Sequence, residues 1–133
     1  MSDLEHAKSL LGMARGDLNA LRGMLSPAIS SGESFFADEV FGFHAQQAAE
    51  KCLKAWIARL GNRYPRTHDL MALIEALRGA GQDTSGLDSL VDLNPFAVQY
   101  RYESLDSDED ELDRGALLTE VQALFDRVEG LLG

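Results

Sequence analysis

The chain has 133 residues, 45% of them hydrophobic, and a formal net charge of -10. This length suits one domain with one hydrophobic core, and the sequence predicts a single domain over residues 1–133. The acidic balance argues against a surface that adheres generally to nucleic acid, and nothing indicates a reader of DNA sequence. A single cysteine, Cys52, excludes an internal disulfide.

The first predicted helix covers residues 3–25. Its apolar positions recur at helical spacing, and Ser26-Pro27 marks its end because the residue before a proline is pushed out of the α region. The N-terminus has no basic segment followed by an apolar one, and no apolar run approaches membrane-spanning length. The sequence therefore predicts a cytoplasmic protein without a membrane segment.

The central predicted helix begins near Ser34 or Phe35 and continues to about Leu60, where Gly61-Asn62 offers a stop. One stripe of mostly small apolar residues runs along it, and we expect the other helices to pack around this stripe. The stripe consists of Phe41, Ala45, Ala48, Ala49, Cys52, Trp56 and Leu60. The polar residues, which include an ion pair of Glu50 with Lys54, are expected mainly on the other side: Gln46, Gln47, Glu50, Lys51 and Lys54.

Three shorter or later helices follow. A linker, residues 63–67, leads into a helix from His68 to about Leu77 with Thr67 as its cap, and a short helix spans roughly residues 87–93. Residues 96–104 fit either a helical turn or an extended loop. The last helix is predicted to start near Asp108 or Glu109 and to reach Leu131. With no strand-like alternation, the sequence predicts an all-α, antiparallel up-and-down bundle of four to five helices.

The charges are unevenly spread. Residues 51–68 contain five bases and no acid, namely Lys51, Lys54, Arg59, Arg63 and Arg66. One interpretation is a solvated helix end whose cations complement the helix dipole. The other is a local approach for an anionic ligand, with Arg63, Arg66 and His68 leading into a helix N-terminus.

A second cationic position lies at Tyr100-Arg101-Tyr102. Aromatic rings beside an arginine can stack on a base while the guanidinium binds phosphate. Arg101 can equally pair with a local acid such as Glu103. The acidic run from Asp106 to Asp113 fits a solvated helix start or a contact with a basic protein. The three histidines are dispersed, and the sequence predicts no metal site and no cofactor.

Three blocks of sequence resemble the HEPN domain family, in the same order and spacing. They are Phe43-His-Ala-Gln-Gln-Ala-Ala-Glu-Lys-Cys-Leu-Lys-Ala-Trp56, Tyr64-Pro-Arg-Thr-His-Asp-Leu70 and Leu93-Asn-Pro-Phe-Ala-Val-Gln-Tyr-Arg-Tyr102. The resemblance covers roughly residues 3–131. It implies a helical bundle that forms a homodimer, and in prokaryotes a minimal nucleotidyltransferase as partner in a toxin–antitoxin pair.

Many members of that family are metal-independent RNases with an Arg-x4-6-His motif. The resemblance places the arginine at Arg101, but residues 103–114 contain no histidine, so the motif is incomplete there. Arg63 to His68 fits Arg-x4-His in a different place, the linker after the central helix. The resulting first hypothesis is a nucleotide- or RNA-binding module that acts with a nucleotidyltransferase. Its ligand-binding residues are Lys51, Lys54, Arg63, Arg66 and Tyr102.

Two alternatives accompany that hypothesis. One is a metal-independent endoribonuclease that uses Arg101 and His68 as catalytic residues, because histidine can exchange a proton near neutral pH. The other is a purely protein-binding helical module.

Overall fold

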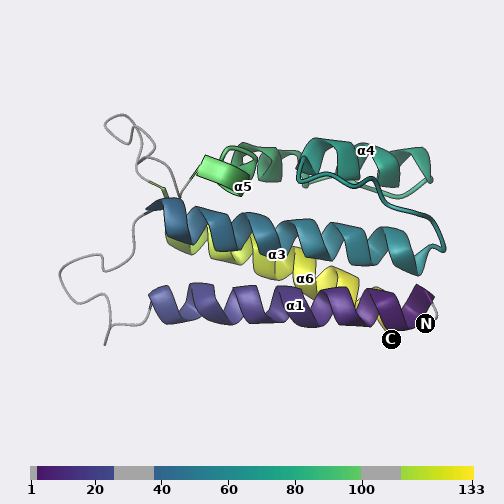
Figure 1. Ribbon diagram of the computed structural model, residues 1–133, viewed down its shortest axis with the longest axis horizontal. Coiled ribbons are helices and arrows are strands. Elements are labelled where there is room, and N and C mark those ends of the chain that lie inside the picture. Colours follow the sequence, from purple (N-terminus) through teal and green to yellow (C-terminus); the bar gives the residue numbers. More distant parts are fainter. Residues whose placement is uncertain (1–2, 26–37, 100–111) are drawn as a thin grey trace.

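The computed structural model describes residues 3–25, 38–99 and 112–133, and within these ranges the chain forms helices and loops without a strand (Figure 1). The predicted all-α fold of packed helices is confirmed. The elements are α1 (Asp3–Met24), α3 (Asp38–Arg59), α4 (Leu70–Gly79), the 3-10 helix η1 (Asp88–Leu93), α5 (Phe96–Gln99) and α6 (Arg114–Leu132).

The three long helices each pack against the other two, and α1 runs antiparallel to both α3 and α6 (Figure 1). The helices α3 and α6 run in the same direction, and their first turns are joined by an ion pair of 2.9 Å between Arg114 and Asp38. Arg15 of α1 pairs with Glu129 near the other end of α6 at 2.6 Å. The chain between α3 and α6 carries α4, η1 and α5, which cover the side of α3 that faces away from α1 (Figure 1).

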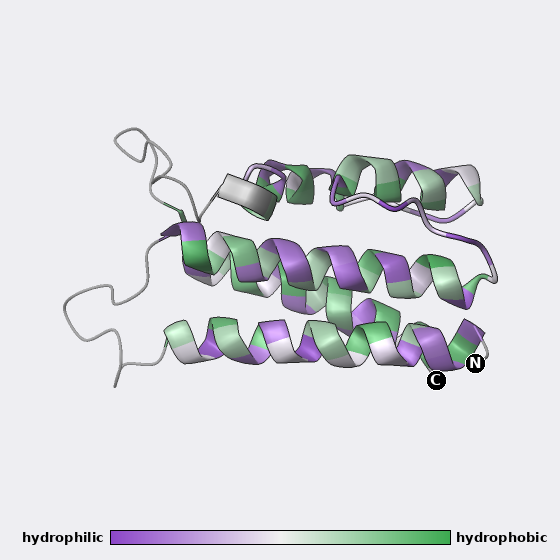
Figure 2. Cartoon of the chain, viewed as in Figure 1, coloured by the Kyte–Doolittle hydropathy of each residue, from purple (hydrophilic) through white to green (hydrophobic). Residues whose placement is uncertain are grey.

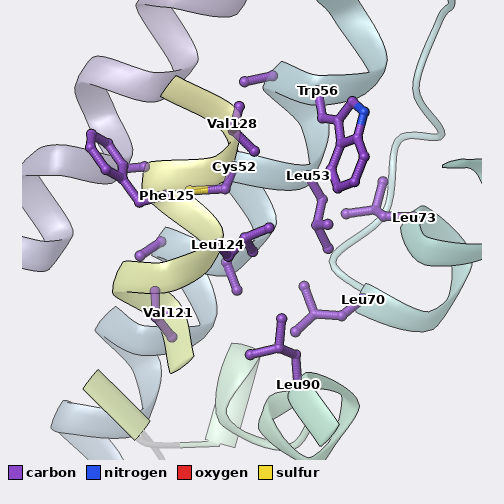
Figure 3. Close-up of a cluster of buried hydrophobic side chains, with 14 of the residues drawn as sticks. Cys52, Leu53, Trp56, Leu70, Leu73, Leu90, Val121, Leu124, Phe125 and Val128 are labelled. Atoms are coloured by element: carbon purple, nitrogen blue, oxygen red, sulfur yellow. The ribbon is translucent and has the colours of Figure 1, made fainter. Parts of the chain in front are cut away.

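Helix α3 is the centre of the fold, as predicted, and it is buried on two sides. Cys52 lies beside Phe125 and Val128 of α6, whereas Leu53 lies beside Leu70 of α4 (Figure 3). Every residue of the predicted stripe is buried except Leu60, which is 36% exposed. The inclusion of Leu60 was wrong because α3 ends one residue earlier, and the chain turns through Gly61 with a positive φ of 81°.

Gly42 permits the close approach of α5 to α3. A Cβ built on Gly42 would lie 2.4 Å from the nearest ring atom of Phe96, far inside ordinary contact distance. Phe96 is buried at this point, so the pair fixes where the chain after η1 returns to the start of α3.

Two helix starts differ from the prediction. Helix α4 begins at Leu70, and its cap is Asp69, whose carboxylate accepts from the backbone N–H of Met71 at 2.9 Å. Thr67, the predicted cap, instead accepts from the N–H of Asp69 at 3.0 Å, and it lies two residues before the cap position. Helix α6 begins at Arg114 and is capped by Asp113, which accepts from the N–H of Ala116. Both caps are aspartates. The short aspartate side chain can accept from backbone N–H groups that have no partner within the helix, so aspartate is favoured at the cap position and disfavoured in the helix interior.

The long helices carry hydrophobic and hydrophilic residues in alternating bands along their length (Figure 2). This is the pattern of helices that bury one face in a hydrophobic core and expose the other face. Across the ranges that the structure describes, no helix is both long enough and apolar enough to span a membrane.

Candidate functional site

The linker between α3 and α4, residues 60–69, contains two of the four predicted ligand-binding cations, Arg63 and Arg66. Its start is held by Tyr64, whose hydroxyl lies 2.8 Å from Nε2 of His6. The two rings are stacked with centroids 5.8 Å apart, and Nζ of Lys54 lies 5.4 Å from the centroid of the Tyr64 ring. Tyr64 therefore ties the linker to both α1 and α3.

The end of the linker is held at His68. Its Nδ1 lies 2.9 Å from Oε1 of Glu50, and its backbone carbonyl accepts a hydrogen bond of 3.0 Å from Nε2 of Gln46. Gln46 and Glu50 are one turn apart on α3, and both are buried. The side chain of His68 is nevertheless 66% exposed. Two buried polar residues thus fix an imidazole that faces solvent.

The carboxylate of Glu50 has three hydrogen-bond partners. Besides His68, it accepts from Nζ of Lys54 at 2.9 Å and from Nε2 of Gln46 at 3.0 Å. Burial raises the pKa of this carboxyl, but the hydrogen bonds from Lys54, His68 and Gln46 outweigh burial and lower the pKa below its ordinary value of 4.5. Glu50 is therefore ionised at neutral pH.

The two predicted lysines are both paired with acids. The predicted pair of Lys54 with Glu50 is confirmed, and the Lys54 side chain is only 13% exposed. Nζ of Lys51 lies 2.9 Å from Asp17 of α1, whose other carboxylate oxygen lies 3.0 Å from Nδ1 of His44. Because an acid offsets each lysine charge, these two residues contribute less to an anion-attracting surface than the sequence suggested.

The arginines of this region differ from the lysines. Arg59, Arg63 and Arg66 are exposed. Within the described residues, the structure shows no ion pair for any of the three. Arg59 is the last residue of α3, and Arg63 and Arg66 lie on the same linker as His68.

Other predicted site residues lie outside the described part of the chain. These are Tyr100, Arg101 and Tyr102, together with residues 106–111 of the acidic run. The last residue of that run, Asp113, is described and caps α6. In the described ranges, no three His, Cys, Asp or Glu side chains gather in a way that could hold a metal ion.

Sequence reasoning placed Gln46 and Glu50 on the polar side of α3, and this was wrong because α4 and the linker cover that side. One signal could have shown it. Leu53 and Ile57 continue the same helical face at spacings of three and four residues, and both are buried. A polar pair that leads into an apolar face indicates a buried polar contact rather than a solvated surface.

The three sequence blocks meet around the start of α4. Gln46 and Glu50 of the first block contact His68 of the second. Asn94 of the third block accepts from the backbone N–H of Leu70 at 2.9 Å. Their joint occurrence in the sequence therefore reflects one local structure rather than three separate features.

The fold defines the chain as an all-α bundle. Within it, Gln46 and Glu50 of the central helix hold the linker that leads into the next helix through their contacts with His68. The HEPN domain family matches residues 7–131 of the chain, and the chain belongs to that family. The resemblance noted in the sequence is thereby confirmed. Neither the curated proteins nor the solved structures include a match to the chain.

Proposed function

We propose that this HEPN domain binds a phosphorylated ligand of the nucleotide or RNA type through the linker between α3 and α4. The observation that carries the proposal is the group of exposed arginines, Arg59, Arg63 and Arg66, on a chain whose net charge is -10. Guanidinium groups bind phosphate through paired hydrogen bonds. A cationic surface that lacks acidic partners attracts phosphate despite the overall charge.

His68 supplies a second kind of contact in this proposal. Its ring is exposed on the same linker and is fixed from behind by Glu50. Arginines that attract the phosphate, together with one oriented imidazole, suit a ligand that carries both phosphate and hydroxyl groups. Arg101 and Tyr102 remain proposed ligand contacts on the strength of the family resemblance.

The test is the salt dependence of binding. A fluorescent single-stranded RNA and a mononucleotide are titrated with wild-type protein over a range of salt concentrations. The variants Arg63→Ala and Arg66→Ala should bind RNA more weakly. Each should lower the slope of log affinity against log salt by about 0.7, the value for one phosphate contact on a single strand.

Arg22→Ala is the matched control, because it removes the same charge from an exposed position at the far end of α1. It should leave both affinity and slope unchanged. If wild-type protein shows no saturable, salt-sensitive binding, or if Arg22→Ala weakens binding as much as the linker variants, the proposed site is wrong.

A second candidate function is metal-independent cleavage of RNA with Arg101 and His68. The contact of Nδ1 of His68 with a buried carboxylate favours it, because a fixed imidazole can transfer a proton through its other nitrogen. Cleavage in EDTA would be compared among wild type, Arg101→Ala and His68→Ala. Equal residual cleavage by all three would identify a contaminant.

The family relation also supports a proposed homodimer and a proposed pairing with a minimal nucleotidyltransferase. Light scattering tests the first proposal, and a monomer at high concentration would contradict it. Copurification of the chain with a nucleotidyltransferase from the same genome tests the second. If the Arg63→Ala and Arg66→Ala variants form the complex as well as wild type does, the nucleotidyltransferase contacts a surface other than the linker.

A further inference from the structure

The pair formed by Glu50 and His68 fixes which nitrogen of the imidazole carries the proton. Glu50 is an ionised carboxylate, and an ionised carboxylate only accepts hydrogen bonds. Its Oε1 lies 2.9 Å from Nδ1 of His68, so the proton of that contact belongs to Nδ1. A neutral imidazole has one N–H only. Nε2 of neutral His68 therefore presents a lone pair.

This arrangement holds the whole residue. Gln46 fixes the backbone of His68 through its carbonyl, while Glu50 fixes the ring. Gln46 is fully buried and Glu50 is 4% exposed, and burying such groups costs free energy unless they are hydrogen-bonded. Lys54 completes the set by donating to the second oxygen of Glu50. The ring they hold is two-thirds exposed, and Nδ1 is the nitrogen engaged with the protein.

We propose that Glu50 is a positioning residue that makes Nε2 of His68 a hydrogen-bond acceptor for a hydroxyl group of the ligand. This rests on the proposed function, in which the linker arginines bring a phosphate to the same surface. In RNA a hydroxyl donor, the ribose 2′-OH, stands next to each phosphate, and DNA lacks it. The pair thus gives the site a preference for ribose over deoxyribose.

The tautomer of His68 tests the first half of the proposal without any ligand. Long-range proton–nitrogen NMR spectra at about pH 9, well above the ordinary histidine pKa of about 6.5, distinguish the two neutral forms. Wild-type His68 should be protonated on Nδ1. In Glu50→Gln, the ammonium of Lys54 carries a full charge and should take the single amide oxygen. The amide NH₂ then faces both Nδ1 of His68 and Nε2 of Gln46, which donates to the same Glu50 oxygen in wild type. Of these two nitrogens only Nδ1 can accept, so the amide NH₂ should donate to it. The proton of His68 should therefore move to Nε2.

Asp17→Asn is the matched control, because it makes the same carboxylate-to-amide change in a second carboxylate–histidine pair, Asp17 with His44. It should alter the His44 signals and leave those of His68 unchanged. Protonation of wild-type His68 on Nε2, or no change in Glu50→Gln, overturns the proposal. Circular dichroism melts show whether Glu50→Gln is folded. If this variant does not fold, the tautomer of His68 in the wild-type protein alone tests the proposal.

Binding of RNA and DNA oligonucleotides of one sequence, measured at about pH 8, tests the second half. Wild type should prefer RNA by about three- to tenfold, the worth of one hydrogen bond. Glu50→Gln and His68→Ala should each remove this preference. Arg66→Ala should lower the affinity for both RNA and DNA but leave the preference for RNA unchanged. Equal wild-type affinity for RNA and DNA overturns the ligand-facing role. Absence of binding to either overturns the proposed function, and the tautomer then decides the role of Glu50 alone.

Discussion

Asn94 and Asp69 lie 25 residues apart in the chain, and Nδ2 of Asn94 donates to Oδ1 of Asp69 at 2.8 Å. The amide oxygen of Asn94 simultaneously accepts from the backbone N–H of Leu70. One side chain thus satisfies a free N–H at the start of α4 and also holds the residue that caps the same helix.

Replacement of Asn94 by alanine should lower the free energy of unfolding by about 1–2 kcal/mol, because an N–H of α4 and the cap both lose a partner. Urea denaturation followed by circular dichroism measures the change. Asn62→Ala, at an exposed linker position, is the control and should change stability by less than about 0.5 kcal/mol. Equal effects of the two variants would show that the Asn94 contacts contribute nothing.

Replacement of Gly42 by alanine should destabilise the fold by about 1–3 kcal/mol, because the added methyl would overlap the ring of Phe96. Gly16→Ala provides the opposite case. Gly16 lies inside α1 with no atom within 4 Å of an added Cβ, so alanine should stabilise the helix by about 0.5–1 kcal/mol. Thermal melts of both variants compare the signs directly. A stabilising Gly42→Ala would mean that α5 does not pack here.

The fold class could be predicted from the sequence because helical periodicity is a local signal that the core then satisfies. The ends of α1 and α3, which the sequence predicts from the local signals Ser26-Pro27 and Gly61-Asn62, agree with the structure to within about a residue. The start of α4 could not be predicted to the residue. Thr67 and Asp69 are both suitable caps, and the choice between them depends on Asn94, a distant residue.

The candidate site could be predicted only in part, for the same reason. Helical spacing alone predicted the pair of Glu50 with Lys54, four residues apart. The contact of Glu50 with His68 joins residues 18 positions apart and depends on how the linker returns along α3. The contact of Lys51 with Asp17 joins two different helices. The charge pattern of residues 51–68 therefore overstated how many cations face solvent.

Ionisation of Glu50 should make the free energy of unfolding depend on pH. Its pKa is below 4.5 in the folded state, because the hydrogen bonds from Lys54, His68 and Gln46 outweigh burial, and it returns to about 4.5 on unfolding. The stabilisation is therefore fully present above about pH 4.5 and is lost as the pH falls through the folded pKa. Glu50→Gln, which cannot ionise, should be less stable than wild type by about 1–3 kcal/mol at pH 7.

Urea denaturation of wild type and Glu50→Gln at a series of pH values from about 5 to about 3 measures this difference, in a range below the ordinary histidine pKa of about 6.5. The gap between the two proteins should narrow in acid, because wild type alone loses the carboxylate contribution. Other carboxylates titrate equally in both proteins and cancel in the comparison. A gap that is constant with pH would show that ionisation of Glu50 contributes nothing to stability.

Cys52 should be inert in the folded protein. Burial raises the pKa of its thiol, and the charges of Asp17 and Asp126 raise it further, so the reactive thiolate is suppressed. The sulfur lies between α3 and α6, beside Phe125 and Val128 (Figure 3). A reagent can reach it only after these two helices separate, which breaks the core.

Alkylation of Cys52 by iodoacetamide at about pH 8 should therefore be slower than that of glutathione by the factor that the folding equilibrium imposes, about a thousandfold or more for a stable small domain. Increasing urea should accelerate the reaction in parallel with the loss of helix. The chain has one cysteine, so mass spectrometry counts the modified fraction without ambiguity. Native alkylation at the glutathione rate would show that α6 separates from α3 far more readily than this packing permits.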